Sequence, residues 1–193
     1  MCDDIRQKVI IVSAPSGAGK TTLIKHLLAT FPQLEFSVSA CSRPKRENEV
    51  DGKDYYFMDV AAFKQKINEN AFIEWEEVYP NHFYGTLKEE INRIWNKNHI
   101  VLFDVDVKGG INLKKIFRQK AISIFISPPS LEVLKQRLMN RHTETAESLD
   151  IRIEKASYEM TFASQFDYII VNDQLENAIT EISDIVHHWI DGI

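Results

Sequence analysis

Short apolar runs alternate along the chain with longer stretches whose apolar positions have helical spacing. The short runs are rich in β-branched residues, which is typical of strands that are buried on both faces of a parallel sheet. We expect such strands at VIIV (9–12), FSVS (36–39), IVLFDVD (100–106), ISIFIS (122–127) and YIIV (168–171). Because helical stretches separate them, the pattern predicts an α/β fold with a parallel β-sheet core flanked by helices.

Two helix starts are indicated by capping residues. Thr86 is followed three residues later by Glu89, a capping-box pattern, and Ser130 stands directly before a helically spaced set of leucines. We therefore expect one helix to begin just after Thr86 and another just after Ser130.

Two regions interrupt the alternation of strands and helices. Residues 40–85 are rich in charged and aromatic positions and predict a small, mostly β insertion with one short helix near 60–69. Residues 131–161 predict amphipathic helices separated by the polar break NRHTETAES. Since open α/β sheets bind ligands at the carboxyl ends of their strands, both regions are candidate mobile flaps around that edge.

Composition narrows the class of protein further. With 193 residues, 44% hydrophobic and 26% charged positions, the chain predicts one globular domain. A net charge of -5 argues against a nucleic-acid-coating surface. No apolar run is long enough to cross a bilayer and no secretory signal is evident, so we expect a cytoplasmic protein. Cys2 and Cys41 have neither the number nor the spacing of a disulfide framework or a zinc site.

The stretch VIIVSAPSGAGKTTLIKHLL (9–28) combines a buried strand, a glycine-bearing turn and a helix start. It differs from the phosphate-loop pattern G-x-x-x-x-G-K-[ST] at its first place, Ala14. Glycine is required only where φ is positive or the backbone nearly touches a ligand, and Gly17 and Gly19 occupy the interior of the turn. We expect a nucleotide phosphate site built from Ala14, Pro15, Ser16, Gly17, Ala18, Gly19, Lys20, Thr21 and Thr22. A plain strand-to-helix turn is the alternative, and the loop alone leaves other phosphate-loop proteins open.

Several further motifs appear in a fixed order: SAPSGAGKTT, SRPKR, GKDYYF, FIEW, YGT, FDVD, PPS and IVND. In this order they resemble guanylate kinases over nearly the whole chain. The resemblance implies a P-loop NTPase fold with a small GMP-binding insertion and a helical lid, and Mg²⁺-dependent transfer of phosphate from ATP to GMP, giving ADP and GDP. It also implies a core at about 8–37, 90–129 and 162–193, a GMP-binding subdomain at about 38–89 and a lid at about 130–161.

The resemblance implies a role for each residue around the acceptor GMP. Glu74 matches the carboxylate that accepts hydrogen bonds from the adjacent N1–H and 2-amino donors of guanine. The remaining matches are the phosphate-binding residues Arg43, Arg46, Tyr55 and Tyr84 and the base-binding residues Ser39, Thr86 and Asp106. Without the family match, the arginines would be an exposed basic loop and Glu74 the polar face of an edge strand.

On the donor side, the resemblance implies that Lys20 and a set of lid arginines stabilise the transferring phosphoryl group. Thr21 matches a Mg²⁺ ligand, with Asp104 near the ion, directly or through a water molecule. Asn172 matches a residue that contacts adenine, and the lid arginines are Arg137, Arg141 and Arg152. Without the match, Asp104 would be a strand-terminal cap and the arginines solvated positions on a helix.

Four local features differ from the family pattern. Pro44 directly follows Arg43, Lys108 replaces a glutamine, and His142 replaces a glycine. The connection YPNHFYGT is one residue longer than usual, with His82 as the extra residue, so we expect a loose hairpin tip there.

Two other functions remain open at this point. One is a related kinase that phosphorylates a ribose phosphate, which would have no use for the Glu74 carboxylate. The other is a non-catalytic guanylate-kinase-like module that binds protein partners, although such modules have typically lost parts of the phosphate loop. The sequence leaves the oligomeric state open and predicts ATP and GMP as the binding partners, with no nucleic acid or membrane.

Overall fold

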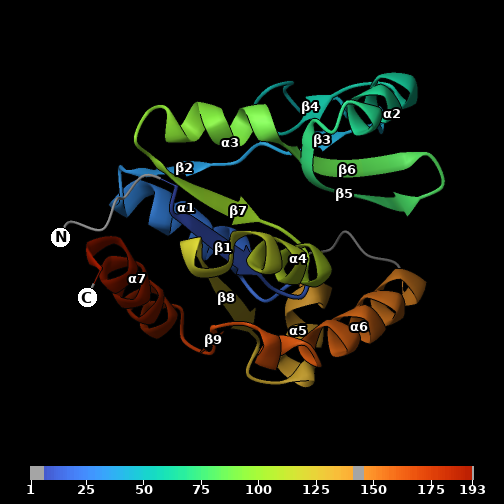
Figure 1. Cartoon of the computed structure of the whole chain (residues 1–193). Helices are drawn as coiled ribbons and strands as arrows, with labels where there is room; N and C mark the ends of the chain where they lie inside the picture. Colours follow the sequence, from blue (N-terminus) through green and yellow to red (C-terminus); the bar gives the residue numbers. More distant parts are fainter. Residues whose placement is uncertain (1–6, 141–145, 193) are drawn as a thin grey trace.

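The computed structural model describes residues 7–140 and 146–192, which form two β-sheets with helices around them (Figure 1). The strands are β1 (Val9–Ser13), β2 (Leu34–Phe36), β3 (Ala40–Cys41), β4 (Tyr56–Phe57), β5 (Phe72–Tyr79), β6 (His82–Leu87), β7 (Ile100–Asp104), β8 (Ala121–Ser127) and β9 (Tyr168–Val171). The helices are α1 (Lys20–Thr30), α2 (Val60–Asn68), α3 (Lys88–Trp95), α4 (Val107–Phe117), α5 (Leu131–Met139), α6 (Ala146–Met160) and α7 (Leu175–Asp191), with 3-10 turns at Arg118–Lys120 and Ala163–Gln165.

The main sheet is parallel, has the strand order β2-β7-β1-β8-β9 and carries helices on both faces. Strand β1 runs through its centre, and its side chains are fully buried. Ile10 and Val12 pack with α1 and α7 on one face, whereas Val9 and Ile11 pack with α3 and α4 on the other. The predicted α/β fold with a buried parallel sheet is therefore confirmed.

Strand β9 departs from the expectation of burial on both faces. Tyr168, Ile169 and Val171 are 43%, 45% and 51% exposed, and only Ile170 is fully buried. In the sheet order β9 is an edge strand that pairs with β8 alone. An apolar run indicates a strand but does not show whether the strand lies at the centre or the edge of the sheet. The expectation of burial on both faces was therefore wrong for β9.

The strand expected at 36–39 lies two residues earlier. In β2, Leu34 and Glu35 pair with Ile100 and Val101 of β7. After Phe36 the chain leaves the main sheet, although the amide of Ser37 still donates a hydrogen bond to the Leu102 carbonyl at 3.0 Å. Residues 37–39 instead carry the chain toward the second sheet.

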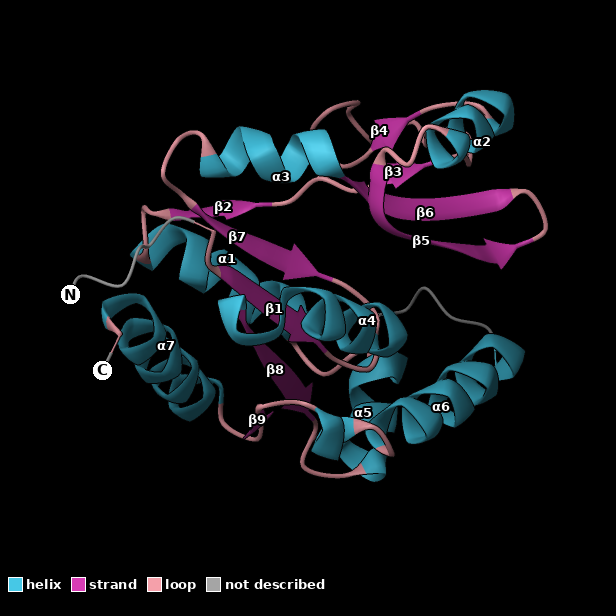
Figure 2. Cartoon of the chain, in the orientation of Figure 1, coloured by secondary structure: helices cyan, strands magenta, loops and turns pink. Residues whose placement is uncertain are grey.

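The second sheet is inserted between β2 and β7, with the strand order β4-β3-β6-β5 (Figure 2). Helix α2 packs on it through the fully buried Phe63, whose ring stacks on Phe72 at 4.4 Å and on Phe83 at 5.5 Å between centroids. Such stacked aromatic pairs give a small sheet a core of its own. The expected small, mostly β insertion with one short helix is confirmed.

The predicted capping box at Thr86 is wrong, whereas the predicted cap at Ser130 is confirmed. Thr86 lies inside β6, and its hydroxyl donates a hydrogen bond to Glu74 at 2.8 Å. Helix α3 instead has Leu87 at its N-cap position, with no side-chain hydrogen bond. At the start of α5, the Ser130 hydroxyl accepts a hydrogen bond from the Val133 amide at 3.2 Å.

The hairpin between β5 and β6 turns tightly at Pro80 and Asn81, where Asn81 has a φ of 61°. The expected loose tip is therefore wrong. A register shift between Glu77 and Tyr79 accommodates an additional residue within the strand, as a β-bulge does.

Helices α5 and α6 form a pair through the buried side chains of Leu134, Leu138 and Ala156. Both lie within the stretch that was expected to be helical. The polar break was expected at 140–148; its residues 141–145, which include Arg141 and His142, fall outside the described residues, and α6 already begins at Ala146. Among residues 7–140 and 146–192, no helix combines the length and the apolar character that a membrane-spanning segment requires.

Candidate functional site

The loop between β1 and α1 takes the conformation that its glycines permit. Gly17 and Gly19 have φ values of 93° and 97°, a region that side-chain-bearing residues rarely adopt. Ala14, directly after β1, does not have a positive φ, so an alanine fits at the first place of the motif. The amide of Ala18 donates to the Pro15 carbonyl at 3.1 Å and closes the turn.

A cavity of about 310 Å³ lies against this loop and the first residues of α1. The free amides at the beginning of a helix and the positive end of its dipole favour an anion at such a place. We call it the loop cavity, and its lining is Ala14, Pro15, Ser16, Gly17, Gly19, Lys20, Thr21, Thr22 and Asp106. All but one of the predicted loop residues thus line one cavity; the exception, Ala18, is fully buried.

Asn172, predicted to contact adenine, is 5% exposed and is hydrogen-bonded to the phosphate loop. Its side-chain amide donates to the Ala18 carbonyl at 2.8 Å. A Cβ atom at Gly19 would lie 2.2 Å from the amide nitrogen of Asn172. The end of β9 and the phosphate loop therefore fit together only with glycine at position 19, and an adenine contact stays a prediction.

The side chain of Lys20 points to the end of β7. Its ammonium group forms an ion pair with Asp104 and donates to the Val105 carbonyl at 3.1 Å. The parallel register places Asp104 beside Val12, so β7 ends next to the strand that leads into the loop. Sheet pairing thus brings Lys20 and Asp104 together, although they are far apart in sequence.

A second cavity, of about 330 Å³, lies between the second sheet and the ends of the main-sheet strands. We call it the second-sheet cavity. Its lining contains five of the predicted acceptor residues, Ser39, Tyr55, Glu74, Tyr84 and Asp106. Asp104, Val105, Glu76, Val78, Gly85 and Gly109 complete it.

Asp106 lines both cavities. One oxygen of its carboxylate accepts a hydrogen bond from the Gly109 amide at 2.7 Å and caps α4. Capping fixes the rotamer of this side chain between the two cavities. A molecule in the loop cavity and another in the second-sheet cavity would therefore meet at Asp106.

Glu74 is a half-buried carboxylate in the wall of the second-sheet cavity. The fully buried Thr86 hydroxyl donates to it at 2.8 Å. Burial raises the pKa of the Glu74 carboxyl, and the charges of Asp106 and Glu76 add to the rise, while the hydrogen bond from Thr86 opposes it. A ligand that supplies two hydrogen-bond donors would stabilise the ionised form of this carboxylate.

Arg43 is held in place before any ligand binds. Its guanidinium group forms a two-point ion pair with Glu49, in which Nη1 lies 2.6 Å from one carboxylate oxygen. It also lies over the rings of Tyr55 and Phe57, at 5.1 and 5.5 Å from their centroids. The hydrogen bonds that Arg43 donates to the Glu49 carboxylate raise the pKa of Arg43, so the group stays charged.

Arg43 and Arg46 are not among the residues that line the second-sheet cavity. Arg43 reaches it indirectly, because the Tyr55 ring under its guanidinium group is part of the lining and contacts Tyr84 edge-on at 6.0 Å. Arg46 is exposed, and its backbone amide donates at 2.8 Å to Glu49, the same carboxylate that pairs with Arg43.

The three predicted lid arginines differ in their placement. Arg137 on α5 donates to the carbonyl oxygens of Asn172 and Asp173, at 2.9 and 3.4 Å, so it binds the end of β9. Arg152 is partly buried on α6 and lines neither cavity. Arg141 falls outside the described residues. Their contact with a transferring phosphoryl group stays a prediction.

Sequence reasoning missed two acidic residues of this site. Glu76 was not among the predicted site residues, but it lines the second-sheet cavity with Glu74, two positions away on the same strand. The alternation of side chains along a strand could have indicated this. Glu49 was not considered, and the only signal was its place in a charged run shortly after Arg43 and Arg46.

The loop cavity offers oxygen donors that fit Mg²⁺, namely the hydroxyl of Thr21 and the carboxylate of Asp106, with Asp104 nearby. Within the part of the chain that the structure describes, no group of three or more histidine, cysteine, aspartate or glutamate side chains is placed to hold a metal ion. A Mg²⁺ ion here would therefore take most of its ligands from nucleotide phosphates and water.

The glycine loop at the carboxyl end of a central parallel strand, followed by a helix with lysine and threonine at its start, defines a P-loop nucleotide-binding protein. A family model described as guanylate kinase matches residues 6–189. A guanylate kinase of Bacteroides thetaiotaomicron is 48% identical over 183 residues, covering 95% of this chain and 90% of the relative. The chain belongs to the guanylate kinase family.

Two further comparisons agree with this assignment. A guanylate kinase of Chlorobium luteolum is 43% identical over 184 residues, covering 94% of this chain and 93% of the relative. The crystal structure of a guanylate kinase from Anaplasma phagocytophilum superposes with a TM-score of 0.70 and 29% identity, covering 93% of this chain and 84% of that chain. The resemblance inferred from the motifs is thereby confirmed.

Gly19→Ala tests the fit between the loop and Asn172. We expect ATP affinity to fall at least about tenfold, because the positive φ alone strains alanine by about 1–3 kcal/mol and the new Cβ would collide with Asn172. Calorimetric titration with ATP measures the loss, and circular dichroism checks the fold. Gly52→Ala is a matched control, since Gly52 also has a positive φ but its Cβ would be 3.7 Å from the nearest side chain. Unchanged ATP affinity in Gly19→Ala would contradict this account of the loop.

Glu74→Gln tests the raised pKa of Glu74 without any ligand. Because the folded state holds the Glu74 proton more tightly than the unfolded state, the folded protein loses stability as the pH rises from the ordinary value of 4.5 through the raised pKa. Glutamine resembles the protonated acid and has no such loss. The melting temperature of Glu74→Gln minus that of the unsubstituted protein should therefore increase over this pH interval. A difference that is flat with pH would show that burial does not perturb this carboxyl.

Proposed function

We propose that this protein transfers the γ-phosphoryl group of ATP to GMP, forming ADP and GDP. The observation that carries the proposal is the pair of neighbouring cavities that meet at Asp106, one built on a phosphate loop and the other around the half-buried carboxylate of Glu74. Membership of the guanylate kinase family supports it, as does the name guanylate kinase carried by relatives that are 43% to 48% identical.

ATP occupies the loop cavity in this proposal. The backbone amides of the loop and the Lys20 ammonium group contact its β- and γ-phosphates, and Thr21 supplies a hydroxyl ligand to Mg²⁺. When bound, Mg²⁺ neutralises part of the phosphate charge. The helical pair α5 and α6 serves as a lid that excludes water, with Arg137, Arg141 and Arg152 directed to the phosphates when it closes.

GMP occupies the second-sheet cavity. Glu74 accepts hydrogen bonds from the N1–H and 2-amino groups of guanine, with Thr86, Ser39 and Asp106 around the base. The phosphate of GMP binds at Tyr55 and Tyr84, where Arg43 and Arg46 provide the positive charge. Guanidinium groups suit this task, because their fork of donors matches phosphate oxygens and they remain charged.

The chemical step needs no general base. A phosphate oxygen of GMP, already ionised near neutral pH, attacks the γ-phosphorus of ATP while the bond to the oxygen of the ADP leaving group breaks. Positioning of the two nucleotides and stabilisation of charge supply most of the rate enhancement.

We assign these tasks to a core of about 8–37, 90–129 and 162–193, a GMP-binding subdomain of about 38–89 and a lid of about 130–161. A cytoplasmic location suits an enzyme of free nucleotides.

Neither alternative function is favoured. A ribose-phosphate kinase would not need the half-buried Glu74 carboxylate paired with the Thr86 hydroxyl, because removing a carboxylate from water costs free energy unless a ligand satisfies it. A non-catalytic binding module would not need Lys20 and Thr21 at the wall of the loop cavity.

An assay of ADP release with GMP, AMP, UMP and a ribose bisphosphate as acceptors tests the function. We expect turnover with GMP and little with the other three, because only guanine presents the two adjacent donors that Glu74 accepts. Selective turnover of the ribose bisphosphate would favour the related kinase. No turnover with any acceptor would favour the binding module.

Glu74→Gln should weaken the binding of GMP far more than the binding of ATP. Loss of a charged acceptor for two donors is expected to raise the KM for GMP by about 10- to 100-fold, while the KM for ATP stays within about twofold. Steady-state kinetics with each nucleotide varied in turn measure both values. Glu181→Gln, an exposed position on α7, is the control. Equal losses for both nucleotides would argue against base recognition by Glu74.

A further inference from the structure

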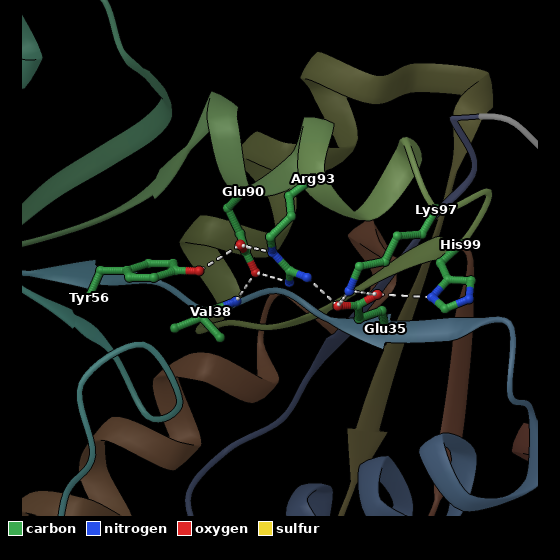
Figure 3. Close-up of polar contacts among 7 residues, drawn as sticks. All are labelled: Glu35, Val38, Tyr56, Glu90, Arg93, Lys97 and His99. Atoms are coloured by element: carbon green, nitrogen blue, oxygen red, sulfur yellow. Dashed lines mark hydrogen bonds and ion pairs between the residues drawn. The ribbon is translucent and has the colours of Figure 1, made fainter.

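Outside the two cavities, one carboxylate is buried in a hydrogen-bond network. Glu90, in the first turn of α3, is 1% exposed (Figure 3). One of its oxygens accepts the Val38 amide at 3.0 Å, and the other accepts the Tyr56 hydroxyl at 2.9 Å. Arg93 donates to both oxygens, at 2.8 and 2.9 Å. Every one of these donors lies within hydrogen-bond distance, so the buried charge is fully paired.

A second carboxylate extends the network to the main sheet. Glu35 on β2 forms an ion pair with Arg93 and contacts Lys97 and His99, both at 2.9 Å (Figure 3). Burial acts to raise the pKa of Glu35, but the hydrogen bonds from Lys97, Arg93 and His99 outweigh it and hold the pKa at about 2. Arg93 therefore connects Glu35 of the main sheet to Glu90, which is hydrogen-bonded to Tyr56 of the second sheet.

The network spans both chain connections between the two sheets. Val38 lies in the segment that leads from β2 to β3, and Glu90 and Arg93 lie on α3, which leads from β6 back to β7. Tyr56 belongs to β4 of the second sheet. Residues that join these segments determine how the second sheet sits on the main sheet.

Two of the three direct partners of Glu90, Val38 and Tyr56, are also next to residues of the second-sheet cavity. Val38 precedes Ser39, and Tyr56 follows Tyr55, and both Ser39 and Tyr55 line that cavity. The Tyr56 amide in turn donates to the Ser39 carbonyl at 2.9 Å. Glu90 itself does not line the cavity, so its effect there would pass through the backbone of these neighbours.

We propose that Glu90 is a positioning residue for the acceptor nucleotide, which holds Ser39 and Tyr55 at the distance and orientation that GMP requires. The proposal rests on the proposed function, in which GMP occupies the second-sheet cavity. Glu90 fixes the segment 38–39 through the Val38 amide and β4 through the Tyr56 hydroxyl, while Arg93 keeps the carboxylate ionised and ties it to Glu35. The hydrogen bonds from Arg93, Val38 and Tyr56 lower the pKa of Glu90 against the opposing effect of burial.

Glu90→Gln and Tyr56→Phe are the test variants. Glutamine keeps the volume of Glu90 but can accept through one oxygen only, and phenylalanine removes a single hydroxyl. We expect the KM for GMP to rise about three- to tenfold in Glu90→Gln and by less in Tyr56→Phe, because hydrogen bonds to a charged group are lost. The KM for ATP and kcat at saturating GMP should stay within about twofold, since the loop cavity does not depend on this network.

Glu89→Gln is the matched control. Glu89 is the neighbouring glutamate on α3, its side chain is 71% exposed and its ion-pair contact with Lys66 is 3.6 Å long. It should leave both KM values unchanged. Combined with Tyr56→Phe, Glu90→Gln should raise the KM for GMP by less than the product of the two single effects, because both substitutions weaken the same hydrogen-bond network.

The outcomes separate this proposal from the proposed function. If the unsubstituted protein does not phosphorylate GMP, the proposed function fails. If it does, and the KM for GMP is unchanged in both folded variants or changes equally with the KM for ATP, the positioning role is overturned. Should Glu90→Gln fail to fold, Tyr56→Phe decides alone: a selective rise in the KM for GMP supports the proposal, and its absence refutes it.

Discussion

The ion pair between Lys20 and Asp104 is the interaction on which the arrangement of both cavities depends. It joins the start of α1, which bounds the loop cavity, to the end of β7, which bounds the second-sheet cavity. Neither charge is fully exposed, with side-chain exposures of 20% for Lys20 and 26% for Asp104, so each one stabilises the other in place. Two residues beyond Asp104, the Asp106 carboxylate that caps α4 forms a wall that the cavities share.

Local signals made much of this arrangement predictable from the sequence. The buried strand VIIV, the two glycines and the helix start follow one another directly, and the positive φ values of Gly17 and Gly19 are properties of single residues. The composition of 40–85 likewise predicted a separate β element. Five predicted acceptor residues, widely spaced in sequence, line one cavity. They could be predicted together because the order of the motifs indicated the family, and the family implies the fold.

The parts that the sequence did not predict depend on long-range partners. Thr86 has the local pattern of a helix cap, yet its hydroxyl bonds to Glu74 on the neighbouring strand, which no local rule can detect. The exposure of β9 follows from its place at the sheet edge, and Arg137 binds carbonyl oxygens at the end of that strand. The pairing of Arg43 with Glu49 depends on the path of an irregular loop, for which hydrophobic periodicity gives no signal.

The contacts of Arg43 have a thermodynamic consequence for an incoming anion. Free arginine side chains sample many rotamers, and immobilising such a chain on binding costs about 0.5–1.5 kcal/mol. In this protein Glu49 and the rings of Tyr55 and Phe57 already restrict the guanidinium group, so that entropy is lost when the chain folds. A phosphate that approaches therefore meets a guanidinium group that is already oriented, and less conformational entropy remains to be lost on binding.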